Sequence, residues 1–402
     1  MSTLSKTIVV VLTIVAFAYV GVGYVLAHST DDKAYQALTV YSEVMDRIQR
    51  DYVDEPNIPK VTSGALHGLL DSLDAESSYM SPLEYKDYKE RSAVKEKAGS
   101  GLALIKIRAG YISVLSVLPG SPAEKLGLEY GDVLEKIADF STEQMSVQQA
   151  NLLLSGDPGG TVSLSVITRT KQEPQAMTVT FAKLTPPKVA EQKLQDNVGY
   201  VGIQEFDADT TKELHDNLVQ LNHEGAQKLI LDLRDCTLGE DPEGISAAQL
   251  FLQSGTITTL KGQTVSPVVS SADPSKVVWS GPVTVLIGNS TAGPAEILAA
   301  AIEGNKRGQT IGDRTFGQAS MQKLIPMDDG SALILTVANY YTPEGKEIPA
   351  DGVPANVEIA PGTDQMTGAP LPPPPQSSSP DDPTVKKALQ VLQGGAPAQK
   401  AA

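Results

Sequence analysis

Strand-like and helix-like segments alternate across the second half of the chain, and this alternation restricts the folds that the chain can adopt. Short aliphatic and β-branched runs are followed by longer segments whose apolar residues recur every three or four positions. Strands connected by helices in this way favour a sheet covered by helices, because each connecting helix packs back onto the sheet. We therefore predict a layered α/β core, with strands at 198–204, 228–233 and 283–287 and helices at 210–223, 245–252 and 295–303.

The remaining segments differ from this core in pattern. The region before it begins with apolar residues at helical spacing and continues with short alternating runs, such as 111–117 and 161–167, that Pro and Gly turns separate. The region after it is rich in proline and serine and cannot bury enough apolar area to order itself, although a short helix is predicted at 385–392. The fold class is therefore multidomain, with α+β and α/β parts. The predicted domains are a helical N-terminal region over 31–97, a β-domain over 98–185, the core over 186–362 and a disordered tail over 363–402.

An uncharged apolar run over residues 8–27 would, as a helix, just cross the hydrocarbon core of a bilayer. Lys6 precedes the run while Asp31 and Asp32 follow it, which favours an N-terminus inside the cytoplasm. We therefore predict a signal anchor or transmembrane helix within residues 1–30. The protein is then expected at the cytoplasmic membrane as a single-pass protein whose bulk is extracytoplasmic, on the periplasmic side. The alternative is secretion after a signal peptide is cleaved near Ala27.

Charge and composition exclude several kinds of site. The 402 residues carry a formal net charge of −16, so a nucleic-acid partner is not expected, because phosphate contacts require clustered Lys and Arg. The single cysteine, Cys236, cannot form an internal disulfide framework. The four histidines are scattered and show no metal-ligand spacing, so we predict no metal and no other cofactor.

The stretch SVLPGSPAEKLGLEYGDVLEKI, residues 116–137, resembles the PDZ signature of a strand, a Pro-Gly turn, a short helix and a Gly-Asp turn. The resemblance implies a domain that adds an incoming peptide as an extra strand and holds its terminal carboxylate with backbone N–H groups. The matching loop is GSGLAL, residues 99–104, and a helix over 146–154 forms the opposite wall. The peptide-binding residues implied by this resemblance are Gly101, Leu102, Ala103, Leu104, Val147 and Leu154.

Over about residues 35–362 the chain resembles the C-terminal processing peptidases, or tail-specific proteases, which are serine-lysine peptidases with a PDZ domain. The resemblance implies a protease-like core of the ClpP/crotonase-like fold, serine-type hydrolysis of polypeptides, and polypeptide or protein C-termini as partners. The segments that carry it are YSEVMDRIQRDYVDEP, KLILDLRDC, VTVLIGNSTAGPAEILAAAIEGNKR, IGDRTFGQASMQ and DGSALILTVANYYTPEGKEIPADGVPANVEI.

The catalytic positions of the family are not intact in this sequence. Active members use a serine at a helix N-terminus as nucleophile and a neutral lysine as its base. Here the serine position is Gly293 and the lysine position is Gln318, while Gln322 stands where the family has a glutamine that orients the lysine. Glycine offers no nucleophile, and an amide cannot accept a proton near neutral pH. The oxyanion segment is also altered, and the backbone N–H groups of Leu238 and Gly239 are its candidates.

Three nearby residues have ordinary interpretations. Asp232 and Arg234 follow the apolar strand residues 229–231, and we interpret them as an ion pair that shapes a loop. Cys236 lies beside Asp235 and lacks the electropositive surroundings that activate a thiolate, so we interpret it as a packing residue.

These residues predict a catalytically degenerate member, a pseudoprotease that binds extended or C-terminal peptides, or that regulates an active relative as a homo- or hetero-oligomer. The membrane, through the N-terminal helix, is the other expected partner. One alternative is an active serine-type endopeptidase with a relocated dyad, Thr291 or Ser320 with Lys323. Another alternative is a structural assembly scaffold.

Overall fold

The computed structural model describes residues 35–92, 98–106, 110–169, 171–184, 189–359 and 378–394. The chain divides into two compact units, Met1–Leu66 and His67–Ala402. The described part of the first unit contains a helix over residues 35–51 and the beginning of α2 (Ile58–Asp71). All further elements belong to the second unit, so the functional residues predicted above lie within one compact unit.

The structure corrects the prediction of a transmembrane helix and of a location at the cytoplasmic membrane. Among the described residues, no helix is long and apolar enough to cross a bilayer. The helix over 35–51 carries several charged side chains, and α2 has 14 residues, which would extend only about 21 Å against about 30 Å of hydrocarbon. The predicted span at 8–27 and the alternative cleavage site near Ala27 lie outside the described residues.

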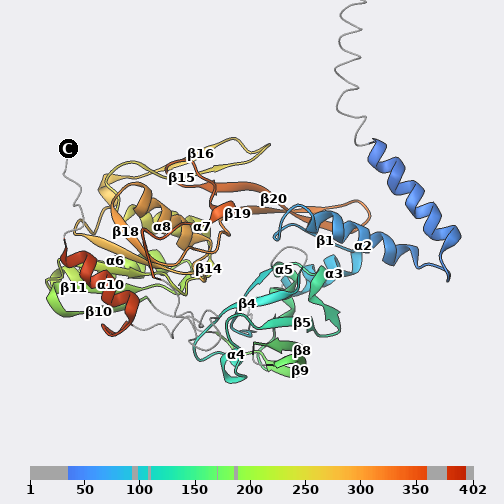
Figure 1. Cartoon of the computed structure of the whole chain (residues 1–402), viewed down its shortest axis with the longest axis horizontal. Helices are drawn as coiled ribbons and strands as arrows, with labels where there is room; N and C mark the ends of the chain where they lie inside the picture. The colour runs from blue at the N-terminus through green and yellow to red at the C-terminus, as the bar shows by residue number, and fades with distance from the viewer. Residues whose placement is uncertain are drawn as a thin grey trace, which may run out of the picture. The chain divides into compact units, whose positions relative to one another are not determined.

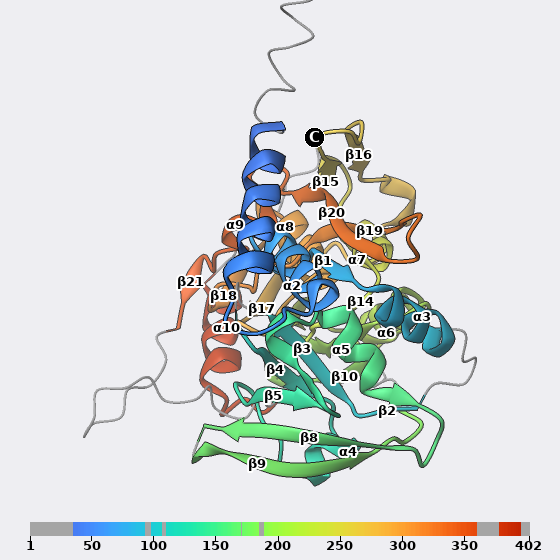
Figure 2. The same ribbon diagram turned by 90° about the vertical axis from the view of Figure 1, so that its right-hand side faces the viewer.

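The predicted PDZ domain is an antiparallel sheet with strand order β3-β4-β5-β8-β9, seen in Figure 2. Helix α5 begins at a capping box in which Ser146 and Gln149 exchange hydrogen bonds, and it closes one side of the sheet. Inward-facing residues of the sheet and of α5 form one hydrophobic cluster. The elements are β2 (Ala98–Gly99), β3 (Leu102–Lys106), β4 (Ile112–Val117), α4 (Pro122–Lys125), β5 (Val133–Ile137), β6 (Phe140–Ser141), η1 (Thr142–Gln144), α5 (Val147–Leu153), β7 (Ser155–Gly156), β8 (Thr161–Thr168) and β9 (Lys171–Thr180).

The core contains a sheet of order β10-β11-β13-β17-β18-β21, in which all neighbours are parallel except β10 and β11. Side chains alternate across β13, so Leu229 and Leu231 pack with helices α6, α7 and α8 while Ile230 faces the other side, against α10. This two-sided burial matches the continuous apolar runs in the sequence. The elements are β10 (Ala190–Lys193), β11 (Val198–Gly202), α6 (Thr210–His223), β13 (Lys228–Asp232), α7 (Asp241–Gln249), β17 (Val283–Ile287), α8 (Pro294–Gly304), β18 (Gly308–Gly312) and β21 (Val357–Glu358).

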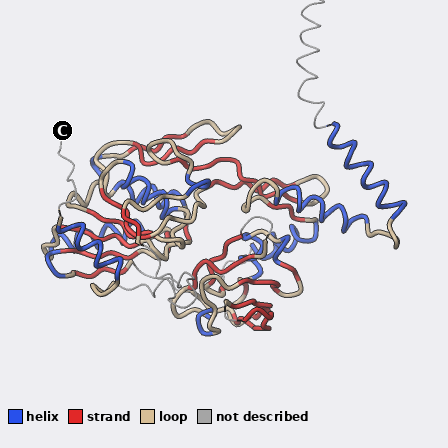
Figure 3. Tube along the Cα trace, in the orientation of Figure 1, coloured by secondary structure: helices blue, strands red, loops and turns tan. Residues whose placement is uncertain are grey.

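A second sheet of the core has the order β1-β20-β15-β16, with β19 paired to β20. Strands β19 and β20 form a long hairpin (Figure 3), and Gln322 lies in β19. A short parallel pair, β12 and β14, stands apart from both sheets. The remaining elements are β1 (Ser78–Met80), α3 (Pro82–Ser92), η2 (Gln195–Asn197), β12 (Glu205–Phe206), β14 (Leu238–Gly239), β15 (Thr256–Lys261), β16 (Val268–Ser271), η3 (Pro274–Lys276), β19 (Ser320–Pro326), β20 (Ala332–Tyr341) and α9 (Ile348–Asp351).

Helix α10 (Pro383–Gln393) lies within the segment predicted to be a disordered tail, close to the short helix predicted at 385–392. It covers the face of the core sheet opposite α6, α7 and α8 (Figure 1). Val385, Ala388 and Leu392 share one face of the helix and are buried against the sheet, which explains why this part of a proline-rich segment folds.

Candidate functional site

Gly293 is the N-cap of α8, directly after the loop that follows β17. Its φ is 56° and its ψ is −119°, a left-handed backbone conformation that glycine adopts without strain. A Cβ atom placed at Gly293 would lie 3.8 Å from Oδ1 of Asp241. The position predicted to correspond to the family's nucleophile therefore faces a carboxyl group, and it has no side chain of its own.

Gln318 lies between β18 and β19, where its amide is already engaged. Its Nε2 donates a hydrogen bond of 2.9 Å to Oε1 of Glu76, in the turn after α2. An amide nitrogen held in this way is a donor and has no lone pair to accept a proton. The position predicted to correspond to the family's lysine thus holds an amide that donates a hydrogen bond to an acid.

Glu296 joins these two positions. This fully buried side chain lies in the first turn of α8, and its Oε2 accepts the backbone N–H of Gly293 at 3.0 Å and that of Gln318 at 2.7 Å. Its Oε1 accepts the N–H of Gly317 at 2.6 Å and the hydroxyl of Thr315. The carboxylate therefore fixes the start of α8 against the loop of Gln318, so residues far apart in sequence are neighbours here.

Three carboxyl groups of this site have pKa values well above their ordinary range. Burial raises the pKa of Glu76 to about 7, with a smaller contribution from Asp74. Burial likewise raises the pKa of Asp241 to about 7, aided by the charges of Glu240 and Glu296. Burial raises the pKa of Glu296 to about 7 although its four hydrogen bonds favour the charged form. Carboxyl groups with raised pKa values therefore lie next to both Gly293 and Gln318.

The structure also shows the contacts of the residues proposed for a relocated dyad, Thr291, Ser320 and Lys323. Thr291 is fully buried, and its hydroxyl donates to the carbonyl of Leu233 at 2.7 Å and accepts the N–H of Gly288 at 3.0 Å. The Ser320 hydroxyl accepts a hydrogen bond of 2.8 Å from Nε2 of Gln322, so these two share one face of β19. Lys323, the next residue on that strand, is exposed. The two hydroxyls are bound to groups that cannot act as a base.

The candidate oxyanion residues, Leu238 and Gly239, lie in a short β-strand. Leu238 and Gly239 form β14, which pairs with Glu205 and Phe206 of β12, and both are exposed. A Cβ atom at Gly239 would lie 2.3 Å from the carbonyl oxygen of Phe206, so this close approach requires glycine.

Asp232 and Arg234 form the predicted ion pair, with Arg234 Nη2 at 2.6 Å from Asp232 Oδ2. The pair is part of a larger buried group that the sequence analysis missed: Arg234 Nη1 lies 2.9 Å from Asp382 at the start of α10, and the Tyr200 hydroxyl donates to Asp232 at 2.7 Å. Cys236 is fully buried in the core, and burial raises the pKa of its thiol, with Glu205 and Asp235 adding to the effect. A buried thiol of raised pKa is a packing residue.

The residues implied by the PDZ resemblance fall into two groups. Leu102, Leu104, Val147 and Leu154 belong to the hydrophobic cluster between the sheet and α5. Gly101 and Ala103 point to the opposite face and line a cavity between this domain and the core. Farther along that face, Ile105 and Leu115 pack against Ala292 and Phe316 of the core, next to Gly293.

Glu76, Asp241 and Glu296 were missed by the sequence analysis. Glu296 stands three residues after the N-cap of α8, which is the spacing of the acidic partner in a capping box, so a sequence signal for it existed. Glu76 and Asp241 reach the site only through tertiary contacts. Among the described residues, no group of three His, Cys, Asp or Glu side chains is arranged to hold a metal ion.

Comparisons with known proteins agree with this architecture. Residues 197–359 match peptidase family S41, and residues 113–168 match the PDZ domain. The chain is 31% identical to the carboxy-terminal processing protease CtpA of Bacillus subtilis strain 168 over 333 residues, which span 82% of this chain and 70% of that protein. It is 32% identical to a carboxyl-terminal-processing protease of Picosynechococcus over 300 residues, 72% of this chain and 70% of that protein.

Among solved structures, the photosystem II D1 C-terminal processing protease is similar, with a TM-score of 0.65 and 25% identity over 80% of this chain and 92% of that one. The predicted multidomain α/β fold, with a PDZ domain and a protease-like core, is thereby confirmed.

Proposed function

This chain belongs to the carboxyl-terminal processing protease family, and from that premise we propose that it is a member that binds polypeptides without cleaving them. The observation that carries the proposal is the pair of groups at the aligned catalytic positions. Gly293 has no side chain, and the amide of Gln318 donates to Glu76. In serine hydrolases, loss of the nucleophile costs on the order of 10⁶ in turnover.

The surroundings of Gly293 support the same proposal. A serine hydroxyl needs a neighbouring base to become a nucleophile, and a lysine can be that base only when it is neutral. The site instead gathers carboxyl groups, which would hold an amine in its charged form. The hydroxyls of Thr291 and Ser320 already bind a carbonyl oxygen and an amide nitrogen, respectively. In the part of the chain that the structure describes, no specific contact favours the relocated dyad.

The PDZ domain supports the binding half of the proposal. Such domains bind peptides through an exposed strand edge, and β3 is an edge strand of its sheet. The same domain contacts the core beside Gly293 through Ile105 and Leu115. A polypeptide bound there would lie next to the former catalytic positions.

The test is incubation of the full chain with an unstructured protein, followed by mass spectrometry of the products. We expect the substrate to be recovered intact and to be retained by the chain in a pull-down. Fragments that disappear in Thr291→Ala or in Ser320→Ala would contradict the proposal and establish a relocated nucleophile. Absence of any retained polypeptide would contradict its binding half.

A further inference from the structure

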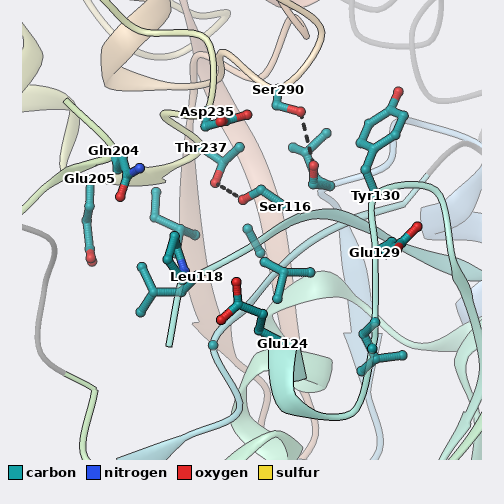
Figure 4. A pocket seen from close by; sticks show the side chains of 18 residues that line it. Ser116, Leu118, Glu124, Glu129, Tyr130, Gln204, Glu205, Asp235, Thr237 and Ser290 are labelled. Carbon is teal, nitrogen blue, oxygen red and sulfur yellow. Dashed lines mark hydrogen bonds between the residues drawn. The ribbon is translucent and has the colours of Figure 1, made fainter. Parts of the chain in front are cut away.

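A cleft of about 420 Å³ lies between the PDZ domain and the core, large enough for several peptide side chains. The PDZ domain lines it with the start of β3, the end of β4 and the turn after α4, and the core lines it with β12, the loop after β13 and Ser290. Two hydrogen bonds join the walls: the hydroxyls of Ser116 and Thr237 are 3.0 Å apart, and the Ser290 hydroxyl donates to the carbonyl of Leu115 at 3.0 Å (Figure 4).

The charged side chains among the described lining residues of this cleft are all acidic. Glu124 and Glu129 of the PDZ domain and Glu205 and Asp235 of the core approach it from different sides (Figure 4). None of its described lining residues is a lysine, arginine or histidine. By contrast, the larger cavity between α3 and the PDZ domain is lined by acids together with Arg91 and His67, which pair with Asp87 and Glu84.

Two of these acids, Glu205 and Asp235, are partly buried. Burial raises the pKa of Asp235 to about 6, with Asp232 adding to the effect and Arg234 opposing it, and burial with Asp207 raises the pKa of Glu205. Carboxyl groups in such surroundings gain from a cation, because it favours their charged form. Glu124 is held in place, since its Oε2 accepts the N–H of Gly120 at 2.6 Å.

Apolar side chains form much of the remaining lining, and the other polar ones are uncharged. The apolar residues are Ala103, Leu115, Val117, Leu118, Pro119, Leu128 and Leu238. Long basic side chains match this combination, because their aliphatic stems pack on apolar surface while the charged group reaches polar partners. We propose that this cleft binds the lysine or arginine side chains of an extended polypeptide. The inference rests on the proposed function and names the class of polypeptide that the chain selects.

The test measures fluorescence anisotropy of the full chain with three labelled peptides that differ at one central residue. One peptide carries arginine, one norleucine, which keeps the aliphatic stem, and one glutamate. We expect the arginine peptide to bind about tenfold or more tightly than the norleucine peptide, and this ratio to shrink at high salt. The glutamate peptide should bind most weakly.

A double variant, Glu205→Gln with Asp235→Asn, should remove most of the preference for arginine, whereas the exposed control Glu173→Gln should keep it. Equal affinity of the arginine and norleucine peptides for the unmodified chain would overturn the inference and leave the proposed function standing. That comparison requires no variant to fold. Cleavage of a bound peptide would instead contradict the proposed function.

Discussion

Gly293 and Gln318 donate their backbone N–H groups to the same oxygen, Oε2 of Glu296. The two positions that we propose as counterparts of the family's nucleophile and base are thus held together. The carboxylate that joins them is fully buried and accepts two further hydrogen bonds, from Thr315 and Gly317. We infer that the geometry of this site is maintained by a structural contact and that its stability depends on Glu296.

Glu296→Gln should therefore destabilise the chain. A glutamine offers one acceptor oxygen in place of two and directs an NH₂ group at donors that need an acceptor. Leaving buried donors unsatisfied costs about 1–3 kcal/mol each, so we expect a loss of roughly 2–4 kcal/mol. Urea denaturation at pH 8 measures it, with Glu344→Gln at an exposed position as the control. A loss no larger than that of the control would contradict the structural role of Glu296.

Stability should also fall as the pH rises through neutrality because of the raised pKa values at this site. Glu76, Asp241 and Glu296 each have a pKa of about 7 in the folded chain, above their ordinary values of 4.5, 3.8 and 4.5. The folded state therefore binds these protons more tightly than the unfolded state. Their contribution is fully present below about pH 4 and is lost as the pH rises through about 7.

Asp241→Asn tests this pH dependence, because it removes one of the three ionisations. The decrease in the free energy of unfolding between pH 5 and pH 8 should be smaller in the variant by roughly 1–3 kcal/mol. Urea denaturation at both pH values measures it. The exposed Asp328→Asn should behave like the unmodified chain, and an unchanged decrease in Asp241→Asn would refute the assignment.

Restoring the two family residues should not by itself restore hydrolysis. In Gly293→Ser with Gln318→Lys, the new amine would lie beside Glu76, and a neighbouring carboxylate keeps a lysine charged. Adding Glu76→Gln should raise the cleavage rate of an unstructured protein by roughly tenfold or more over the double variant. Initial rates of peptide release measure the difference. A double variant as active as the triple one would show that Glu76 does not suppress the base.

Docking of α10 should depend on Asp382. This residue caps the helix and pairs with the buried Arg234. Asp382→Asn keeps an oxygen that can cap the helix but replaces the buried charge that pairs with Arg234, so we expect amide hydrogen exchange in α10 to accelerate by roughly tenfold or more. Mass spectrometry of exchange in residues 383–393 measures it. Asp381→Asn, at a neighbouring exposed position, should leave the exchange rate unchanged. Equal exchange rates in the two variants would show that the Asp382–Arg234 ion pair does not hold α10 in place.

The sequence allowed the strongly periodic elements to be predicted closely. The structure has α6 at Thr210–His223 and β17 at Val283–Ile287, with the predicted bounds, because buried apolar faces determine these elements locally. Helix α7 begins at Asp241, four residues before its predicted start, because polar residues at its N-terminus carry no apolar signal.

Long-range contacts account for what the sequence did not reveal. Helix α10 folds because Asp382 meets Arg234, 148 residues away in the chain, and because its apolar face finds the core sheet. Glu76 reaches Gln318 over 242 residues. Leu102 and Leu104, which are predicted to line a peptide pocket with Val147 and Leu154, are buried with these residues in one hydrophobic cluster, whereas Gly101 and Ala103 line the cleft.

Intact-mass spectrometry after exposure of the full chain to a serine-directed sulfonyl or phosphonate probe is the most direct test, because it depends on no particular substrate. The chain is expected to keep its unmodified mass, since among the described residues the hydroxyls of Thr291 and Ser320 have no base as hydrogen-bond partner that would make them nucleophiles. A single covalent adduct that a competing polypeptide prevents, mapped to Thr291, Ser320 or Ser290, would show that this protein cuts what it binds.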